Sequence, residues 1–247
     1  MRHVASTSFG ADSMAQIILA KEHDEPLDEV VYCEVMFTPE ISGEIPEHRD
    51  FIYETAIPWL ERELGLKTTI LRANTTMWDD FHTERVRGST KGKLRGFPIP
   101  GLCSVKRDCK LPPIKDYMAQ LPSDSTQYVG IAADEVRRLK SLERTGCVSL
   151  LAKYGIDQKQ ARSIDERHGL LSPIYAFTGR NGCFFCPNAR MSELRHLYEH
   201  HPDLWRLLRQ LQETPNTSRN CFTCSLTVFD LEEKFKREEG ARDASPI

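Results

Sequence analysis

Several features that mark specialised classes of protein are missing from this sequence. No apolar run approaches the roughly 20 residues needed to cross a bilayer, so we expect no membrane partner. The first residues lack an apolar signal core, so we expect a cytoplasmic protein. There is also no internal repeat and no low-complexity tract. These absences leave an ordinary globular protein as the expectation.

A strong excess of one charge is missing too. The 33 Lys and Arg residues nearly balance the 36 Asp and Glu residues, and the formal net charge is -3. No overall positive field therefore attracts nucleic acid, although the composition does not exclude a local basic patch. Hydrophobic residues make up 40% of the 247 positions. This size and composition fit one large α/β domain, or a domain with a small appendage.

Cysteine, in contrast, is abundant. Eight cysteines occur in a chain that we expect in a reducing compartment, where thiols stay reduced. Cys33 and Cys147 lie in apolar stretches and are expected in the core. Two Cys-x-x-Cys pairs indicate metal ligation ahead of disulfides, and four thiolates suit either Zn²⁺ or an iron–sulfur cluster. The pairs are Cys183 with Cys186 and Cys221 with Cys224.

Apolar segments with strand and helix spacing alternate along much of the chain. This alternation predicts an α/β fold, an open and mostly parallel twisted sheet with helices on both faces. We expect Pro58 to kink one helix and Pro202 to interrupt another. The expected strands are 3–5, 29–35, 67–71 and 127–133, and the expected helices are 13–21, 46–64, 150–168 and 192–212.

The regular pattern stops between residues 78 and 113. This segment holds four glycines, four prolines and eight basic residues, among them Arg85 and Lys110. Long irregular segments are uncommon without a purpose, so we expect a functional loop. The alternative is a basic loop that is merely solvated.

A second pattern lies where the first strand meets the first helix, at Ser8-Phe9-Gly10-Ala11-Asp12-Ser13. A helix N-terminus offers unbonded N–H groups and the positive end of the dipole to a phosphate. Gly10 lets the backbone approach closely, Ser8 and Ser13 add hydroxyls, and Asp12 suits Mg²⁺. No Gly-Lys-Ser/Thr follows, so this is not a Walker loop. The alternative is an ordinary turn with serine caps.

This Ser-x-Gly-x-Asp-Ser pattern resembles the PP-loop of the adenine-nucleotide alpha-hydrolase superfamily, which includes ATP pyrophosphatases and PAPS reductases. Phe9 replaces the usual first glycine. The resemblance implies a HUP/Rossmann-like domain at 1–178 that binds ATP or a related adenine nucleotide with Mg²⁺, followed by a Cys-rich helical region at 179–247. The loop contacts it implies are Ser6, Ser8, Phe9, Gly10, Asp12 and Ser13.

The segment 128–139 resembles the Gly-x-Arg-x-Asp-Glu-x-x-Arg segment of the same superfamily. Ala132 stands where many relatives have Arg. The resemblance implies that Gly130, Asp134, Glu135 and Arg138 face the nucleotide. The alternative is a helix N-cap followed by solvated charges.

Two cysteine segments add to the resemblance. The stretch 109–117 resembles a segment that supplies iron–sulfur ligands in cluster-bearing sulfonucleotide reductases. The stretch 182–188 resembles the second ligand pair of PAPS reductase-like proteins, many of them encoded by phages. The resemblance implies a [4Fe–4S] cluster and a contact of Lys110 with phosphate or cluster. The candidate cluster ligands are Cys103, Cys109, Cys183 and Cys186, with Cys221 or Cys224 able to replace one of them. The alternative is a four-thiolate Zn²⁺ site formed by the two Cys-x-x-Cys pairs, Cys183 with Cys186 and Cys221 with Cys224.

The resemblance implies an enzyme that adenylates a substrate for sulfur or nitrogen transfer, with catalytic roles for Asp12, Asp134 and Lys110. A tRNA or DNA acceptor and a sulfur donor or cysteine desulfurase are the expected partners. One alternative is a sulfonucleotide (PAPS/APS) reductase, but the sequence lacks a C-terminal Glu-Cys-Gly-x-His-type motif. Another is a non-catalytic nucleotide- or nucleic-acid-binding module, in which the basic stretch follows a phosphate backbone.

Overall fold

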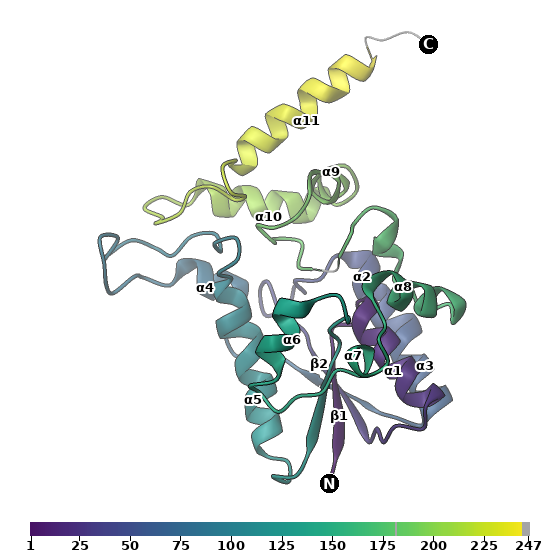
Figure 1. Cartoon of the computed structure of the whole chain (residues 1–247). Coiled ribbons are helices and arrows are strands. Elements are labelled where there is room, and N and C mark those ends of the chain that lie inside the picture. The colour runs from purple at the N-terminus through teal and green to yellow at the C-terminus, as the bar shows by residue number, and fades with distance from the viewer. Residues whose placement is uncertain (181, 244–247) are drawn as a thin grey trace. The chain divides into compact units, whose positions relative to one another are not determined.

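The computed structural model describes residues 1–180 and 182–243, and of 241–243 only the backbone (Figure 1). The chain forms two compact units. Unit 1 comprises Met1–Glu34, Glu44–Ala73 and Lys110–Asn181. Unit 2 comprises Val35–Gly43, Asn74–Cys109 and Gly182–Ile247. Unit 2 therefore includes two segments from the first half of the chain besides the Cys-rich C-terminal region.

A parallel sheet forms the centre of unit 1. Its strands run in the order β3-β2-β1-β4, and every neighbouring pair is parallel. All residues of β2 are buried, as expected for a strand that is covered on both faces. The α/β class with an open parallel sheet is thus confirmed. The strands are β1 (His3–Thr7), β2 (Glu29–Cys33), β3 (Thr68–Leu71) and β4 (Thr126–Val129).

Helices cover both faces of this sheet. The chain steps outward from β1 through β2 to β3 and then returns to the other side of β1 for β4. Because such crossovers are right-handed, α1 (Ala11–Glu22) and α3 (Ile57–Leu64) lie on one face and α5 (Leu111–Ala119) lies on the other (Figure 1). The remaining helices of unit 1 are α2 (Pro46–Asp50), α6 (Val136–Leu142), α7 (Leu150–Lys153) and α8 (Gln158–Arg167).

Two expected helices differ in detail. The stretch 46–64 is helical throughout, but η1 (Phe51–Ala56) takes π-helical spacing just before Pro58, which cannot donate a backbone hydrogen bond. The stretch 150–168 is divided into α7 and α8. Gly155, at φ 69°, ends the first helix, and Asp157 caps the second through its side chain.

Unit 2 is mainly helical and has an aromatic core. The ring of Phe37 packs on those of Phe184 and Phe185, at centroid distances of 5.0 and 5.7 Å. The ring of Phe97 packs on those of Phe81 and Phe222, at 5.2 and 5.1 Å. The helices are α4 (Met77–His82), α9 (Met191–His200), α10 (Pro202–Glu213) and α11 (Val228–Asp243).

The break near Pro202 is confirmed, because α9 ends at His200 and α10 begins at Pro202. The basic segment 78–113 is less irregular than expected. It begins within α4 and ends in the π-helical turn η2 (Lys106–Lys110) and the start of α5. In the described part of the chain, no helix has the length and apolar character of a membrane span.

Candidate functional site

The loop between β1 and α1 is held by its own hydroxyl groups. The Ser13 hydroxyl donates to the Gly10 carbonyl at 2.9 Å and accepts from the Thr7 hydroxyl and the Ser8 N–H, at 3.1 and 3.3 Å. The Thr7 oxygen in turn accepts from the Phe9 N–H at 2.8 Å. The proton of Ser13 is therefore directed into the loop, which makes this serine a brace for the backbone.

Phe9 holds the loop in a conformation that non-glycine residues rarely adopt. Its φ is 55°, in the left-handed region, and its side chain is fully buried. The ring packs edge-on against Tyr32 at a centroid distance of 5.4 Å. Burial of an aromatic ring is large enough to offset the strain of about 1–2 kcal/mol.

The second sequence motif meets the first one here. Gly130 follows β4, and a Cβ atom at this position would lie 2.7 Å from the backbone of Asp12 and Ser13. Strand order reverses between β1 and β4, and open α/β sheets bind ligands at such a switch point. The structure thus brings residues 8–13 and the segment after Gly130 together at the position that favours a ligand.

Asp12 lies among other charged groups. Burial raises the pKa of Asp12 to about 6, and the carboxylates of Glu135 and Asp134 add to the rise. The guanidinium groups of Arg138 and Arg162 oppose it. A divalent cation would relieve the repulsion among these carboxylates, and Mg²⁺ is commonly held by one or two carboxylates plus phosphate oxygens. The donor chemistry therefore fits Mg²⁺.

The other expected residues of unit 1 are held by local contacts. Glu135 accepts from Arg138 at 2.6 and 2.7 Å, and Asp134 accepts from the Gln158 N–H at 3.3 Å. Ser6 accepts from the amide of Gln127 at 2.7 Å, within the sheet.

Lys110 acts on two buried groups of unit 1. Burial raises the pKa of Cys33 to about 11, and the Lys110 ammonium opposes this rise. The same ammonium lowers the pKa of His48, although burial is the larger cause there. Lys110 therefore adds positive charge close to His48, a residue that sequence reasoning missed.

His48 ties the loop to a distant segment. Its Nε2 lies 2.9 Å from the Ser8 carbonyl oxygen and its Nδ1 lies 2.8 Å from the Ser172 hydroxyl. A carbonyl only accepts, so the proton is on Nε2, and Nδ1 accepts from Ser172. Burial lowers the pKa of His48, which keeps the ring neutral. No sequence signal marks this residue.

Tyr175 is a second missed residue. Its hydroxyl oxygen accepts from the Ala11 N–H at 2.8 Å, at the first turn of α1. Arg162 stacks over its ring, 4.7 Å from the centroid, and donates to the Gly179 carbonyl. Tyr175 belongs to the short helix η3 (Pro173–Ala176), which Ser172 precedes. This segment therefore reaches the loop through both His48 and Tyr175.

Asp165 on α8 is buried without compensation. It is fully inaccessible to solvent, and in the described part of the chain neither carboxylate oxygen has a hydrogen-bond partner. Burial raises its pKa to about 9, with smaller contributions from Asp12 and Glu166. The helical spacing of the buried residues Ala161 and Ile164 places Asp165 on the inner face, and that spacing was the available signal.

All six candidate metal ligands lie in unit 2. The Cys109 thiol is buried and donates to the Thr76 carbonyl at 3.6 Å. Burial raises the pKa of Cys109 to about 12, and Asp108, Asp79 and Cys103 add to the rise. Cys103 is therefore close to Cys109, as a shared ligand set requires.

Each Cys-x-x-Cys pair forms a turn that a buried aromatic ring anchors. The Cys186 N–H donates to the Cys183 carbonyl at 3.0 Å, and the intervening phenylalanines enter the aromatic core. Phe222 follows Cys221 and is fully buried, whereas Cys224 is exposed. The backbone thus presents both pairs at loops of the same unit.

Among the described residues, no three cysteine sulfurs lie within 4.8 Å of one another. The four thiolates of a single Zn²⁺ each bind it at about 2.3 Å and so lie close together. The thiolates of a four-iron cluster bind four different irons and lie further apart.

The two cysteines that were expected in the core differ in burial. Cys33 is buried, as expected. The expectation is wrong for Cys147, which is half-buried and whose thiol donates to Gln127 Oε1 at 3.3 Å.

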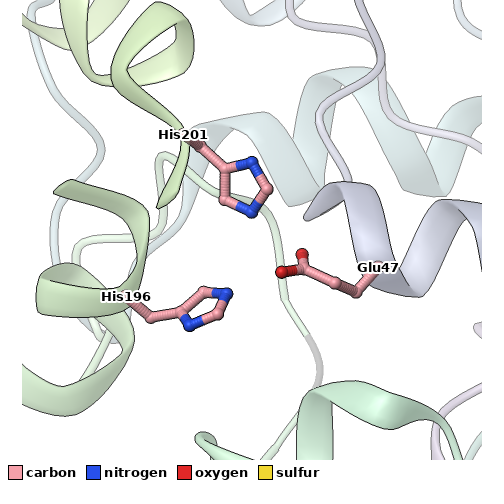
Figure 2. A group of neighbouring side chains, drawn as sticks. All are labelled: Glu47, His196 and His201. Carbon is pink, nitrogen blue, oxygen red and sulfur yellow. The ribbon is translucent and has the colours of Figure 1, made fainter. Parts of the chain in front are cut away.

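Three histidines of unit 2, His196, His200 and His201, gather at the junction of two helices. Figure 2 shows His196 on α9 and His201 at the start of α10, with ring centroids 5.6 Å apart. The His201 carbonyl accepts from the Trp205 N–H at 3.0 Å, so His201 forms the N-terminal boundary of α10. Glu47, labelled in the same view, belongs to α2 of unit 1.

Comparison with known proteins gives limited similarity. No family model matches the sequence, and no curated protein matches it. Among solved structures, the U34-tRNA thiolase NcsA from Methanococcus maripaludis, with its [4Fe-4S] cluster, is similar to this chain. The two share 16% sequence identity and a TM-score of 0.43, over 95% of this chain and 80% of that chain.

Proposed function

We propose that this protein is a PP-loop type enzyme that binds ATP or a related adenine nucleotide in unit 1 and activates an acceptor by adenylation. One observation carries the proposal. The loop 8–13 and the segment after Gly130 meet at the switch point of a parallel sheet, in backbone contact. The two motifs were identified independently in the sequence, so their contact in the fold supports a ligand that both of them bind.

The roles follow from chemistry and position. The first turn of α1 offers its N–H groups and dipole to the phosphates, and Asp12 holds Mg²⁺ with help from Asp134 or Glu135. Bound Mg²⁺ would offset phosphate charge. Arg138 and Lys110 supply fixed positive charge for the charge that develops on the phosphate.

In the proposed reaction, an oxygen of the acceptor attacks the alpha phosphate, and pyrophosphate leaves as the new O–P bond forms. A sulfur or nitrogen nucleophile then displaces AMP from the acceptor. The acceptor is a tRNA or DNA, and the sulfur comes from a sulfur donor or cysteine desulfurase. Cys103, Cys109, Cys183 and Cys186 would hold a [4Fe–4S] cluster that carries sulfur, with Cys221 or Cys224 as a substitute ligand.

Pyrophosphate release from ATP, with and without nucleic acid, tests this proposal. Asp12→Ala should reduce release by a factor on the order of 100, because the cation loses a ligand. The matched control is Asp116→Ala, an exposed position on α5. Equal release by both variants would exclude the assigned mechanism. Sulfite release from PAPS would instead identify a reductase, and nucleotide binding without turnover would identify a binding module.

The metal is tested separately, by an anaerobic absorption spectrum with iron, zinc and sulfide analysis. A broad visible band with about four irons per chain supports the cluster. A colourless protein that contains zinc contradicts it.

A further inference from the structure

A basic hairpin extends from unit 2 at residues 83–96, directly after α4 (Figure 1). Between residues 85 and 93 it has four basic residues and no acidic residue, in a chain whose net charge is -3. In the described part of the chain, none of these four side chains forms an ion pair, and all are exposed. The four are Arg85, Arg87, Lys91 and Lys93.

The hairpin is a fixed scaffold. The Arg85 N–H donates to the Lys93 carbonyl, and the Gly92 N–H donates to the Arg85 carbonyl, both at 2.9 Å. These bonds hold Arg85 across from Lys93. A charged loop that is only solvated needs no such framework, so the geometry favours a surface that holds its cations in place for a partner.

The base of the hairpin is joined to the second cysteine turn. The Leu94 N–H donates to the Asn216 carbonyl at 2.9 Å, and the Ser218 N–H donates to the Leu94 carbonyl at 2.7 Å. A Cβ atom at Gly96 would lie 2.4 Å from the Arg219 carbonyl oxygen, so the two backbones touch. This segment leads directly into Cys221. A ligand on the hairpin would therefore lie on the same part of unit 2 as that turn.

The side chains at the tip of the basic hairpin, residues 85–93, indicate which class of partner it binds. Protein–protein contacts rely on buried aromatic and apolar anchors, and residues 85–93 contain no aromatic residue. A phosphodiester backbone needs only positive charge along its path, which the tip supplies. We propose that the basic hairpin binds the phosphate backbone of a nucleic acid and holds it beside the cysteine-bearing part of unit 2. The inference rests on the proposed function only in identifying this nucleic acid as the acceptor.

Fluorescence-anisotropy titration of the full-length protein tests the inference, with labelled tRNA and a DNA duplex of equal charge as probes. The quadruple variant Arg85→Gln, Arg87→Gln, Lys91→Gln, Lys93→Gln should weaken binding on the order of 100-fold at 0.1 M salt. It should also reduce the slope of log affinity against log salt by roughly 3 to 4, because each lost phosphate contact removes about 0.9 from the slope for duplex DNA and slightly less for single strands.

The matched control removes the same charge from exposed positions of unit 1. The variant Lys67→Gln, Lys115→Gln, Arg144→Gln, Lys159→Gln should keep both the affinity and the slope. The double variant Arg85→Lys, Arg87→Lys should also bind with nearly unchanged affinity, since phosphates respond mainly to charge. This second variant separates loss of charge from loss of folding.

Three outcomes would overturn the inference. The hairpin variant could bind as the unaltered protein does, both quadruple variants could weaken equally, or poly-glutamate could bind as tightly as the nucleic acids. The last result would indicate an acidic protein partner. ATP binding by the unaltered protein is measured in parallel. Its absence would refute the proposed function while the comparison of hairpin variants would still decide the nucleic-acid surface.

Discussion

The two candidate sites are built in different ways. In unit 1, the loop 8–13 is fixed by hydrogen bonds among its own hydroxyls, by Gly130 and by His48. In unit 2, the two Cys-x-x-Cys pairs sit on turns that aromatic rings anchor, and no three cysteine sulfurs are within 4.8 Å of one another among the described residues. Unit 1 therefore presents a preorganised loop at the proposed anion site, whereas unit 2 presents proposed ligands whose final positions would depend on what they bind.

The largest expected effect is in unit 2. Cys183→Ser should lower iron from about four atoms per chain to less than one, because a cluster with three thiolates is poorly held. ATP affinity should stay unchanged, since the loop of unit 1 keeps its contacts. Cys147→Ser, in unit 1, is the control and should retain the iron. Iron analysis and nucleotide titration on the same samples check both statements, and full iron in Cys183→Ser would remove Cys183 from the ligand set.

The next effect concerns the buried Asp165. Burial raises its pKa from 3.8 to about 9, so the folded protein holds a proton that the unfolded chain releases. The free energy of unfolding should therefore fall as pH rises from about 4 to about 9, by up to about 1.4 kcal/mol per pH unit from this group. Asp165→Asn should remove that pH dependence. The free energy of unfolding of this variant should therefore exceed that of the unaltered protein by an amount that grows with pH.

Urea denaturation at pH 5, 7 and 8.5 measures the Asp165 effect. Glu143→Gln, at an exposed position whose charge does not contribute to the pKa of Asp165, should follow the unaltered protein. Stability curves for Asp165→Asn that run parallel to those of the unaltered protein would show that Asp165 is ionised in the folded state.

A third prediction tests the close contact in unit 1. Gly130→Ala adds a Cβ atom 2.7 Å from the backbone of Asp12 and Ser13, so the loop must shift. We expect nucleotide affinity to fall roughly 10- to 100-fold, in line with the cost of overpacking. Gly240→Ala on α11 meets no atom within 4 Å and should leave the affinity unchanged. Calorimetric titration with ATP decides, and wild-type affinity in Gly130→Ala would place the nucleotide elsewhere.

The smallest expected effect is at Tyr175. Its oxygen accepts from Ala11, so its own proton remains for a ligand at the N-terminus of α1. Tyr175→Phe should weaken ATP binding roughly 5- to 10-fold and leave adenosine binding unchanged, because only a phosphate would use this hydrogen bond. Tyr117→Phe, on α5, is the matched control. Equal losses for ATP and adenosine would indicate a structural role.

The sequence predicted what local pattern determines. Buried strands such as β2 have continuous apolar runs, and the turn at Gly10 stands between a strand and a helix, so both were found. His48, Tyr175 and Asp165 were not found, because their importance depends on distant partners. His48 meets Ser172 across 124 positions of sequence. The split at Gly155 was missed because helical spacing continues on both sides of it.

Phe9 has a consequence for how the protein folds. The same residue fills the core beside Tyr32 and sets the left-handed turn of the loop. The loop therefore reaches its final shape only when the ring enters the core, and the core closes only when the loop turns. A glycine at this position would allow the turn to form and open independently. With phenylalanine, formation of the loop at the proposed anion site and packing of the core of unit 1 become one cooperative event.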